Sequence, residues 1–548
     1  MVRLQSCIRK TFPLLLINIA LGYGEAQAQE PRFLPDDPLV RVPAHAVAGQ
    51  LREQKIDELY DFAYNSAHYK KPAATPSLGI NTLGEVPDSA WYTNRHALHR
   101  MTREALQRGA RKSGPPVSPF TVVAAKTEGV TPGFRIKDAK GRLFFVKVDA
   151  KSNPEMATAA DVIGALFFYA LGYNVPENYI LAARREEFQL SPKATIKTAN
   201  GKKRPMHKKE LDNVFDAVSV MKDGRIRLMA SLGIDGKLLG PFSYQDTRSD
   251  DPNDIVPHQQ RRDLRGLAVF CAWLNHTDAK SLNSLDALQG KGSHAQVVHY
   301  LIDFGAAFGS DSDIAKDPRH GREFVVPTSG KEMIRKLSTF GVVPAKWETV
   351  HYPHNLKAVG KFTSDAFDPV LWKSNYPNPA FQAMLPDDAY WAAKQVMAFT
   401  DEDIRVIVEQ GEFSDGRVVD YITNALIARR DAIGRAWFQY VLPVENVRIE
   451  NGELQFDNLA ADHGLVAMAS YKYRWFRWNN AHYKKEPITN AASAKLPSEI
   501  ASANGSYMGC TLVDTARPNH SVTAYFRSHA GEWQLVGIDR KSDPLSLP

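Results

Sequence analysis

The chain has 548 residues, of which 44% are hydrophobic, and a formal net charge of +7. A chain of this length and apolar fraction buries substantial cores and is expected to form two or three domains. The positive charge is a mild excess over the whole length, and no basic and aromatic residues interleave in a nucleic-acid-binding motif, so no nucleic-acid partner is expected. With only three cysteines, disulfides are not expected to hold the fold together.

Residues 1–28 are predicted to form a secretory signal peptide. Arg3, Arg9 and Lys10 precede an apolar run from Phe12 to Leu21, and Ala26-Gln27-Ala28 supplies a small-x-small cleavage signal. That run is too short to span a bilayer, and no later stretch reaches about 18 uncharged apolar residues. The mature chain is therefore expected to be periplasmic or secreted, with no transmembrane segment.

Residues 29–118 are predicted to be an N-terminal extension that packs on a following core. The stretch QLREQKIDELYDFAYNSAH has apolar residues at helical spacing, and proline-rich turns follow it. Trp91 and Tyr92 lie next to asparagine, arginine and histidine, but an aromatic pair in such a segment favours packing over catalysis.

From Phe120 the pattern changes to strands. The segments TVVAAKTEG, FRIKDAKG and LFFVKVD predict three consecutive antiparallel strands with glycine and proline in the turns. Lys147 has apolar residues on both sides in the third strand, which favours a phosphate contact over a solvated position. Gly129 and Gly133 flank the first turn, where backbone N–H groups would be free to approach phosphates, and both are assigned to cofactor binding.

A helix is predicted from Pro154 to Gly172, because proline stands at its start and glycine at its end. Its acids are Glu155 and Asp161. Either acid would complement the helix dipole or take part in a site.

The most informative stretch runs from Leu274 to Ser310. His276, Asp278, Lys280 and Asn283 have the spacing H-x-D-x-K-x-x-N, and D-F-G at Asp303 follows an insert able to form a hairpin. A lone D-F-G is common by chance, whereas four fixed residues followed by D-F-G are much harder to obtain by accident.

This spacing fits phosphoryl transfer. The reaction needs a carboxylate at the incoming hydroxyl, for which Asp278 is placed, and an amide oxygen on a divalent cation, for which Asn283 is placed. A second carboxylate, Asp303, would bridge that cation to the phosphates. The apolar run GLAVFCAWLN predicts a buried helix before the loop, and VVHYLI predicts a strand that ends at Asp303.

Taken in order, Lys147, a helix acid, H-x-D-x-K-x-x-N and D-F-G resemble the protein-kinase-like superfamily. The short glycine turns and the segment LGYNVPENY are more similar to its atypical branches: the HipA-type, phosphatidylinositol-kinase-like, CotH-type and secretory-pathway kinases. Exported bacterial proteins of unknown function have similar segments. The resemblance covers about residues 120–310, and no A-P-E follows D-F-G, so a regulated activation segment of the eukaryotic kind is not expected.

The resemblance implies an α+β, bilobal protein-kinase-like fold over residues 119–442, with a small lobe at about 119–240 and a large lobe at about 241–442. It implies ATP or another nucleotide, with Mg or Mn, as cofactors. Asp278 would be the base or substrate-orienting carboxylate and Lys280 a transition-state cation, while Asn283 and Asp303 would be metal ligands. Lys147 would hold the phosphates and pair with an acid of the helix, for which Asp161 is favoured by position over Glu155.

The polar stretch from Gly240 to Gly266 replaces a standard connection between the lobes. Its aspartates would recruit a second cation and its arginines an anionic substrate, or the charges would pair with one another. Beyond Ser310, DAYWAAKQVMAFTDEDIRVIVEQG and YITNALIARRDAIGRAWFQYVL predict packed helices.

Residues 443–548 are predicted to form a C-terminal all-β sandwich domain. VRIENGELQF is a strong hairpin signal with Asn451-Gly452 at its turn, and SYKYRWFRW, VTAYFRS and WQLVGIDR alternate like strands.

The sequence therefore predicts an exported, Mg-dependent kinase-like phosphotransferase that acts on a protein or an envelope component. Two alternatives remain at this stage: a catalytically inactive binding or structural protein of the cell envelope, and a nucleotidyl transferase on the same fold. The substrate, the phosphoryl donor and the oligomeric state are left open by the sequence.

Overall fold

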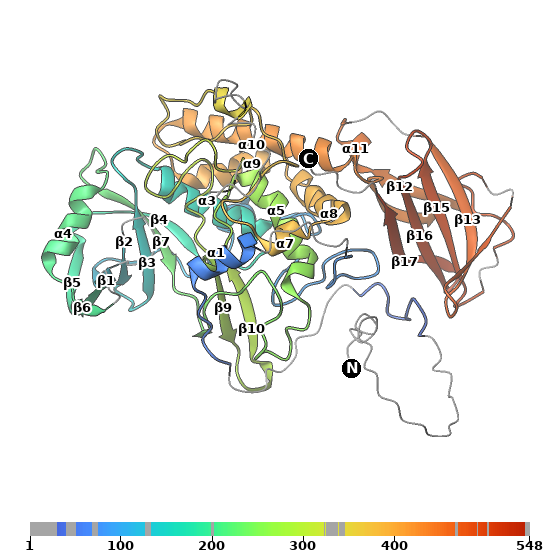
Figure 1. The fold of residues 1–548 in the computed structure, drawn as a ribbon, viewed down its shortest axis with the longest axis horizontal. Helices are drawn as coiled ribbons and strands as arrows, with labels where there is room; N and C mark the ends of the chain where they lie inside the picture. Colours follow the sequence, from blue (N-terminus) through green and yellow to red (C-terminus); the bar gives the residue numbers. More distant parts are fainter. Residues whose placement is uncertain are drawn as a thin grey trace.

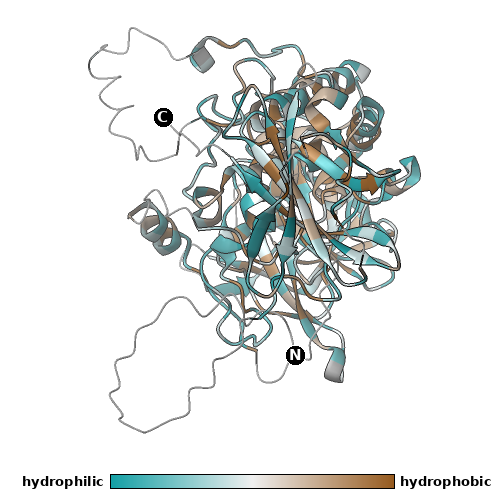
Figure 2. Ribbon diagram, turned by 90° about the vertical axis from the view of Figure 1, so that its right-hand side faces the viewer, coloured by the Kyte–Doolittle hydropathy of each residue, from teal (hydrophilic) through white to brown (hydrophobic). Residues whose placement is uncertain are grey.

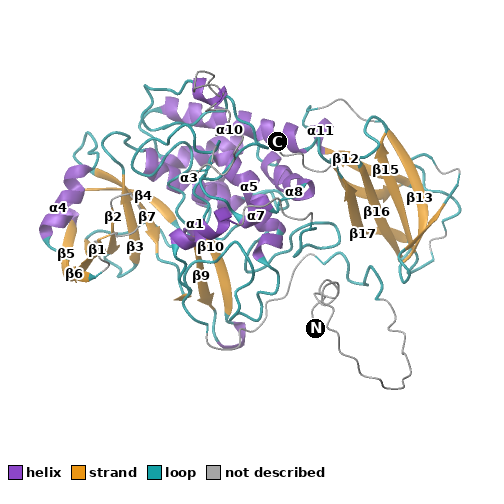
Figure 3. Ribbon diagram, viewed as in Figure 1, coloured by secondary structure: helices purple, strands orange, loops and turns teal. Residues whose placement is uncertain are grey.

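A computed structural model describes residues 30–39, 51–67, 75–125, 133–198, 202–322, 324, 338, 346–465, 470–489, 492–500 and 503–542. The predicted signal peptide and Gly129 lie outside these ranges. The fold is mixed α+β, and strands lie at both ends of the molecule with most helices between them (Figures 1 and 3). Figure 2 shows the apolar residues, in brown, gathered mainly in the interior helices and strands.

The first sheet has seven strands in the order β4-β7-β3-β2-β1-β5-β6. The three predicted strands form its centre and pair antiparallel in sequence order. Four further strands, and a helix that covers one face, were not predicted. The elements are β1 (Phe120–Ala125), β2 (Gly133–Lys137), β3 (Leu143–Val148), β4 (Asn178–Ala183), β5 (Phe188–Lys197), β6 (Lys203–Pro205), α4 (Lys208–Ala217) and β7 (Ile226–Leu232).

The predicted helix is α3 (Met156–Ala170), and 14 of its residues are buried. It lies between the first sheet and the central helices and is rich in alanine, so that neighbouring backbones can approach it closely. Its start is fixed to the end of β3, because the backbone N–H and the hydroxyl of Thr158 both donate to the carboxylate of Asp149, at 3.0 and 2.6 Å.

The central region packs around α5 (Arg262–Leu274), in which every residue is buried. A hairpin of β9 (Ser284–Gln289) and β10 (Gln296–Leu301) follows it, with β8 (Lys237–Leu238) alongside. The largest apolar core joins α3, α5 and the later helices. Those helices are α7 (Pro379–Gln382), α8 (Pro386–Met397), α9 (Asp401–Val408) and α10 (Gly416–Trp437).

Charges of the stretch from Gly240 to Gly266 form ion pairs both within the stretch and with α8. Asp254 contacts the ring of His258 at 2.7 Å, and both side chains are buried. Arg262 and Arg265 both bind Asp388 at the start of α8, at 3.0 and 3.1 Å. Arg262 and Arg265 therefore join α5 to α8, whereas Asp254 and His258 pair within the stretch itself.

The C-terminal region contains a five-stranded antiparallel sheet in the order β14-β13-β15-β16-β17. The hairpin of β11 and β12 turns at Asn451 and Gly452 with φ of 51° and 75°, as the N-G signal predicts. Its apolar side chains share a core with the sheet, so the second layer is a two-stranded hairpin. The elements are β11 (Val444–Glu450), β12 (Glu453–Asn458), α11 (Leu459–Asp462), β13 (Tyr471–Asn479), β14 (Lys484–Pro487), β15 (Tyr507–Asp514), β16 (Ser521–His529) and β17 (Glu532–Lys541).

The segments assigned to the N-terminal extension pack in two places. Phe33 lies in an apolar cluster of the C-terminal sheet, where a side chain on Gly537 would approach the Phe33 ring to 2.3 Å. Trp91 instead stacks on His299 in the central region, with ring centroids 3.5 Å apart. The helices of this part are α1 (Glu58–Ala67) and α2 (Arg103–Arg108). The contact of Phe33 with the C-terminal sheet has no signal in the sequence.

Within the described residues, each helix is too short or too polar to cross a bilayer. Cys271 and Cys510, the cysteines of the described part, are both buried and free.

Candidate active site

Lys147, Asp161 and Asp303 lie together, although they come from three elements. The Lys147 ammonium is 2.9 Å from Oδ2 of Asp161 and 2.6 Å from Oδ1 of Asp303. Strand β3 presents the lysine, the middle of α3 presents Asp161, and Asp303 follows β10 in a left-handed backbone conformation with φ of 61°. Burial lowers the pKa of Lys147, but the two carboxylates outweigh burial and raise it above its usual range, so the amine stays charged.

Asp161 is the helix acid that contacts Lys147, and Glu155 lies elsewhere. The Glu155 carboxylate accepts hydrogen bonds from the backbone N–H and hydroxyl of Ser414, at 3.0 and 3.1 Å. Asp161 also accepts the backbone N–H of Phe304 at 2.8 Å. One carboxylate on α3 therefore holds both the strand lysine and the D-F-G segment.

Close packing of the D-F-G segment against α3 lets the short Asp161 side chain reach the backbone N–H of Phe304. A Cβ on Gly164, one turn further along α3, would lie 2.6 Å from Cβ of Phe304. The ring of Phe304 stacks on Phe168 with a centroid distance of 5.0 Å. Because Gly164 has no side chain, the D-F-G segment approaches α3 closely enough for an aspartate to reach it.

Gly164→Ala is therefore expected to destabilise the protein, although alanine favours helices by about 1 kcal/mol over glycine. The added methyl overlaps Phe304, and overpacking of a buried site costs roughly 1–3 kcal/mol. Gly416→Ala in α10 is the control, because a Cβ there meets no neighbour within 4 Å. Chemical denaturation of both variants tests this; equal stabilities would contradict the close contact.

Asp278, Lys280 and Asn283 form a second cluster on the loop after α5. The Asn283 amide donates to the backbone carbonyl of Asp278 at 2.7 Å and to its carboxylate at 2.9 Å. The Lys280 ammonium is 3.2 Å from the other carboxylate oxygen. Burial raises the pKa of Asp278, and the charge of Asp303 adds to the increase, while Lys280 and Asn283 oppose it.

The hairpin brings the two clusters to one place. The backbone N–H of Ile302 donates to the carbonyl of Asn283 at 3.0 Å, which sets the residue before Asp303 beside the end of the loop. Asp278 and Asp303 are close enough for their charges to repel.

The residues present suit a divalent cation with oxygen ligands. Asp303 would hold it with one carboxylate and Asn283 with its amide oxygen, because the Asn283 N–H groups are used by Asp278. The described residues contain no group of three or more His, Cys, Asp or Glu side chains suited to a metal. Such a pair matches Mg²⁺, which takes one or two protein carboxylates and completes its shell with phosphates and water. When bound, the cation would neutralise charge on the phosphates.

Gly133 pairs with Lys147 in the β2–β3 ladder. A Cβ at Gly133 would lie 2.1 Å from the carbonyl oxygen of Val146, so the glycine is required for strand packing. The predicted phosphate contacts of Gly133 remain a prediction, and those of Gly129 lie outside the described residues.

Several residues that position the site were missed by sequence reasoning. Arg227 on β7 donates to the hydroxyl of Thr158 at 2.9 Å and to the carbonyl of Glu412 at 2.7 Å. Together with Asp149 it anchors the start of α3, and hence Asp161, to the sheet. The signal available in the sequence was the aspartate two positions after Lys147, at the end of the predicted strand.

Lys316 is a second missed residue. It is 1% exposed, and its ammonium donates to the hydroxyl of Thr277 and to the carbonyl of Ala306, each at 2.6 Å. It thus joins the residue before Asp278 to the segment after D-F-G. Burial lowers the pKa of Lys316 to about 8, with Asp311 and Asp278 opposing the decrease.

This pKa predicts a pH dependence of stability. Between pH 8 and pH 10.5 the unfolded chain holds the Lys316 proton while the folded chain releases it, so the free energy of unfolding rises with pH by up to about 1.4 kcal/mol per pH unit. Lys316→Met lacks this contribution. The free energy of unfolding of wild type relative to Lys316→Met should therefore rise by about 1.5 kcal/mol between pH 8 and pH 9.5. Denaturant titrations at both pH values measure it, and a constant difference would contradict the assignment.

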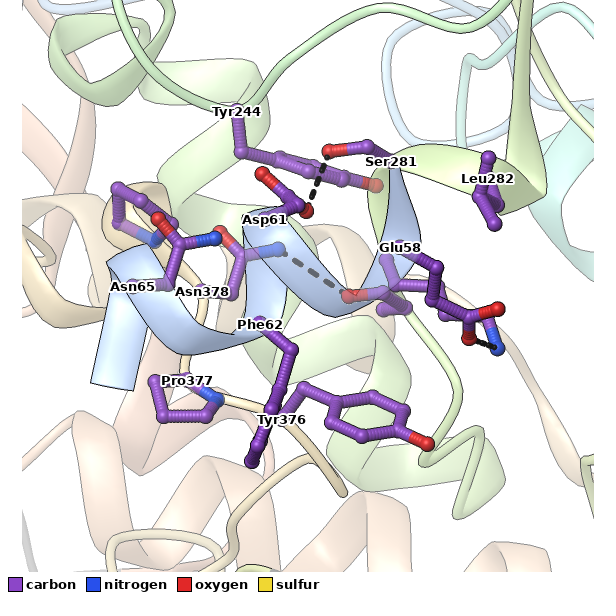
Figure 4. A pocket seen from close by; sticks show the side chains of 13 residues that line it. Glu58, Asp61, Phe62, Asn65, Tyr244, Ser281, Leu282, Tyr376, Pro377 and Asn378 are labelled. Carbon is purple, nitrogen blue, oxygen red and sulfur yellow. Dashed lines mark hydrogen bonds and ion pairs between the residues drawn. The ribbon is translucent and has the colours of Figure 1, made fainter. Parts of the chain in front are cut away.

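Helix α1 lies over the loop that carries Asp278, Lys280 and Asn283 and forms one wall of a pocket (Figure 4). Glu58 binds the Lys280 ammonium at 2.6 Å, and Asp61 accepts the Ser281 hydroxyl at 3.2 Å. The ring of Tyr376 also lines this pocket, and its centroid is 5.3 Å from the Lys280 amine. The N-terminal segment thus adds carboxylates beside the loop, which sequence reasoning did not foresee.

No known family model matches the sequence, and no significant relative is found among curated proteins. Among solved structures, a match is the crystal structure of the Golgi casein kinase, with 10% identity and a TM-score of 0.22. The match covers 72% of this chain and 97% of that chain. A TM-score of this size does not establish a shared fold.

Proposed function

We propose that this protein is an exported, Mg-dependent phosphotransferase with a bilobal, protein-kinase-like architecture, acting on a protein or an envelope component. The observation that carries the proposal is the contact of Lys147 with both Asp161 and Asp303, beside a loop that presents Asp278 and Asn283. The first group suits the phosphates and cation of a nucleotide, and the second suits the acceptor hydroxyl.

In this proposal the residues have separate tasks. Lys147 holds the phosphates of ATP or another nucleotide, Asp303 and Asn283 hold Mg or Mn, and Asp278 orients the acceptor hydroxyl and takes its proton. Lys280 adds positive charge next to Asp278, where negative charge develops on the transferring group.

The first test is nucleotide binding by the chain from Gln29 onward. Binding is measured as a change in the thermal unfolding temperature with a panel of nucleotides, with and without Mg or Mn. A ligand at about 100 times its dissociation constant stabilises its domain by roughly 2.7 kcal/mol. A metal-dependent increase in the unfolding temperature would support the proposal. No increase with any nucleotide would favour the inactive envelope-binding alternative.

The transferred group is identified by a second experiment. Envelope fractions are incubated with the protein and with ATP labelled at either the γ- or the α-phosphate. Labelling of the envelope fraction by γ-labelled ATP alone supports phosphoryl transfer. Labelling by α-labelled ATP would instead assign nucleotidyl transfer to the protein.

A further inference from the structure

A second pocket lies behind the catalytic loop. It is open to solvent, and its empty space, solvent included, is about 330 Å³. Its walls come from the end of α5, from the segment that follows D-F-G, from the chain before α7, and from α10. Its lining includes Arg322, Tyr352, Lys361, His320, Asp317 and Arg429.

Arg429 places a buried positive charge at this pocket without a carboxylate partner. Its side chain donates to the backbone carbonyls of Trp273 and Thr363, both at 2.8 Å, and to that of Ala272. In the described part of the chain, no carboxylate lies within ion-pair distance of it. Burial lowers the pKa of Arg429, and the neighbouring charge of Arg322 lowers it further.

Arg322 is partly buried and likewise bonds to backbone carbonyls. It donates to the backbone carbonyls of Ala366 and Asp365, and burial lowers its pKa. Tyr352 and Asp368 are near enough to favour its charged form, but neither is hydrogen-bonded to it among the described residues. Two guanidinium groups therefore line one pocket, and among the described residues neither forms an ion pair with a carboxylate.

The pocket also offers donors that have no partner in the described structure. The Lys361 ammonium makes no ion pair or side-chain hydrogen bond there. The buried Nδ1 atom of His320 has no hydrogen-bond partner, and it is 3.9 Å from Asp311. Of the lining residues, Asp317 is the carboxylate, and its nearest basic group is Arg319 at 3.9 Å. Four basic side chains, those of Arg322, Arg429, Lys361 and His320, thus line the pocket with one acid.

We propose that this pocket binds a phosphate group. A phosphate would supply the missing negative charge between Arg322 and Arg429, accept hydrogen bonds from Lys361 and His320, and meet the hydroxyl of Tyr352. The site is separate from Lys147 and Asp303, and it does not depend on the proposed transfer reaction. Asn275, at the end of α5, lines the pocket and precedes the loop of Asp278. Its backbone carbonyl also accepts a hydrogen bond from the Lys316 ammonium.

Isothermal titration with inorganic phosphate and with pyrophosphate, at constant ionic strength, tests the proposal in the full mature chain. Lys361→Gln is the informative variant, because its side chain has no partner whose loss would unfold the protein. It is expected to weaken binding at least about tenfold, since a hydrogen bond to a charged group is lost. Lys357→Gln, an exposed lysine on the same segment, makes the same charge change outside the pocket and should bind as wild type does.

Asp303→Asn separates this pocket from the nucleotide site and should leave phosphate binding unchanged. Glycerol 3-phosphate is titrated as well: tighter binding than inorganic phosphate assigns the pocket to a phosphate ester, and equal or weaker binding assigns it to the free ion. The proposal is overturned if no phosphate binds, if Lys361→Gln and Lys357→Gln bind equally, or if Asp303→Asn abolishes binding.

Discussion

Asp303→Asn is expected to abolish metal-dependent nucleotide binding and to leave the protein folded. The carboxylate is the strongest oxygen ligand that the site offers a cation, and the neutral amide that replaces it would also attract Lys147 less. Lys147 keeps Asp161 as a partner, so the buried amine is not left alone. Asparagine is preferred to alanine because it tolerates the left-handed conformation, with φ of 61°.

Thermal unfolding with saturating nucleotide measures this effect. Wild type should gain roughly 2.7 kcal/mol at about 100 times the dissociation constant, and Asp303→Asn should gain nothing. Without ligand the two should unfold within a few degrees of each other, which serves as the folding control. A variant that still responds to nucleotide and Mg would show that Asp303 does not hold the cation.

Asp278→Asn is expected to reduce transfer by about 10²–10⁴-fold, the usual contribution of a positioned acid or base, with nucleotide binding retained. The amide can still accept a hydrogen bond from Asn283, but it cannot take the proton of an incoming hydroxyl. Asp313→Asn, in the segment after D-F-G, is the matched control and should transfer as wild type does.

The pH dependence of transfer gives an independent reading of Asp278. Because burial raises its pKa, the active carboxylate is lost, as pH falls, at a higher pH than for an ordinary aspartate. The decrease of the transfer rate at acid pH should therefore begin at a higher pH than for an ordinary aspartate. This decrease should be absent from the pH profile of Asp278→Asn. If Asp278→Asn transferred phosphate at the wild-type rate, the role assigned to the loop would be wrong.

Local patterns were the part of this protein that its sequence could predict. Strands β1 to β3 alternate and are joined by turns, and α3 has proline before it and glycine after it, so each has a short-range signal. The cluster of Asp278, Lys280 and Asn283 lies within six residues, and short spacing alone sets much of its geometry. Asp161 was favoured over Glu155 from its place in the helix, and in the structure its carboxylate accepts a hydrogen bond from the Lys147 ammonium.

Contacts between distant segments could not be predicted in this way. Strand β5 joins the sheet by parallel pairing with β1, from which it is separated by about sixty residues. Glu58 reaches Lys280 from a helix with no buried residue, and a single ion pair leaves no periodic pattern in a sequence. Lys316 looks like a solvated lysine in the sequence, because nothing local reveals that it is buried.

The contact of Phe33 with the C-terminal sheet has a consequence for the order of folding. Phe33 leaves the ribosome, and any export channel, among the first residues of the described chain, whereas Gly537 and Val536 are among the last. The aromatic side chain must wait for nearly the whole chain before it can be buried, and contacts of such long sequence separation form slowly. Until β17 has been synthesised, Phe33 and the apolar residues of the C-terminal sheet that contact it remain exposed to solvent. A chaperone would protect the chain from aggregation during this interval.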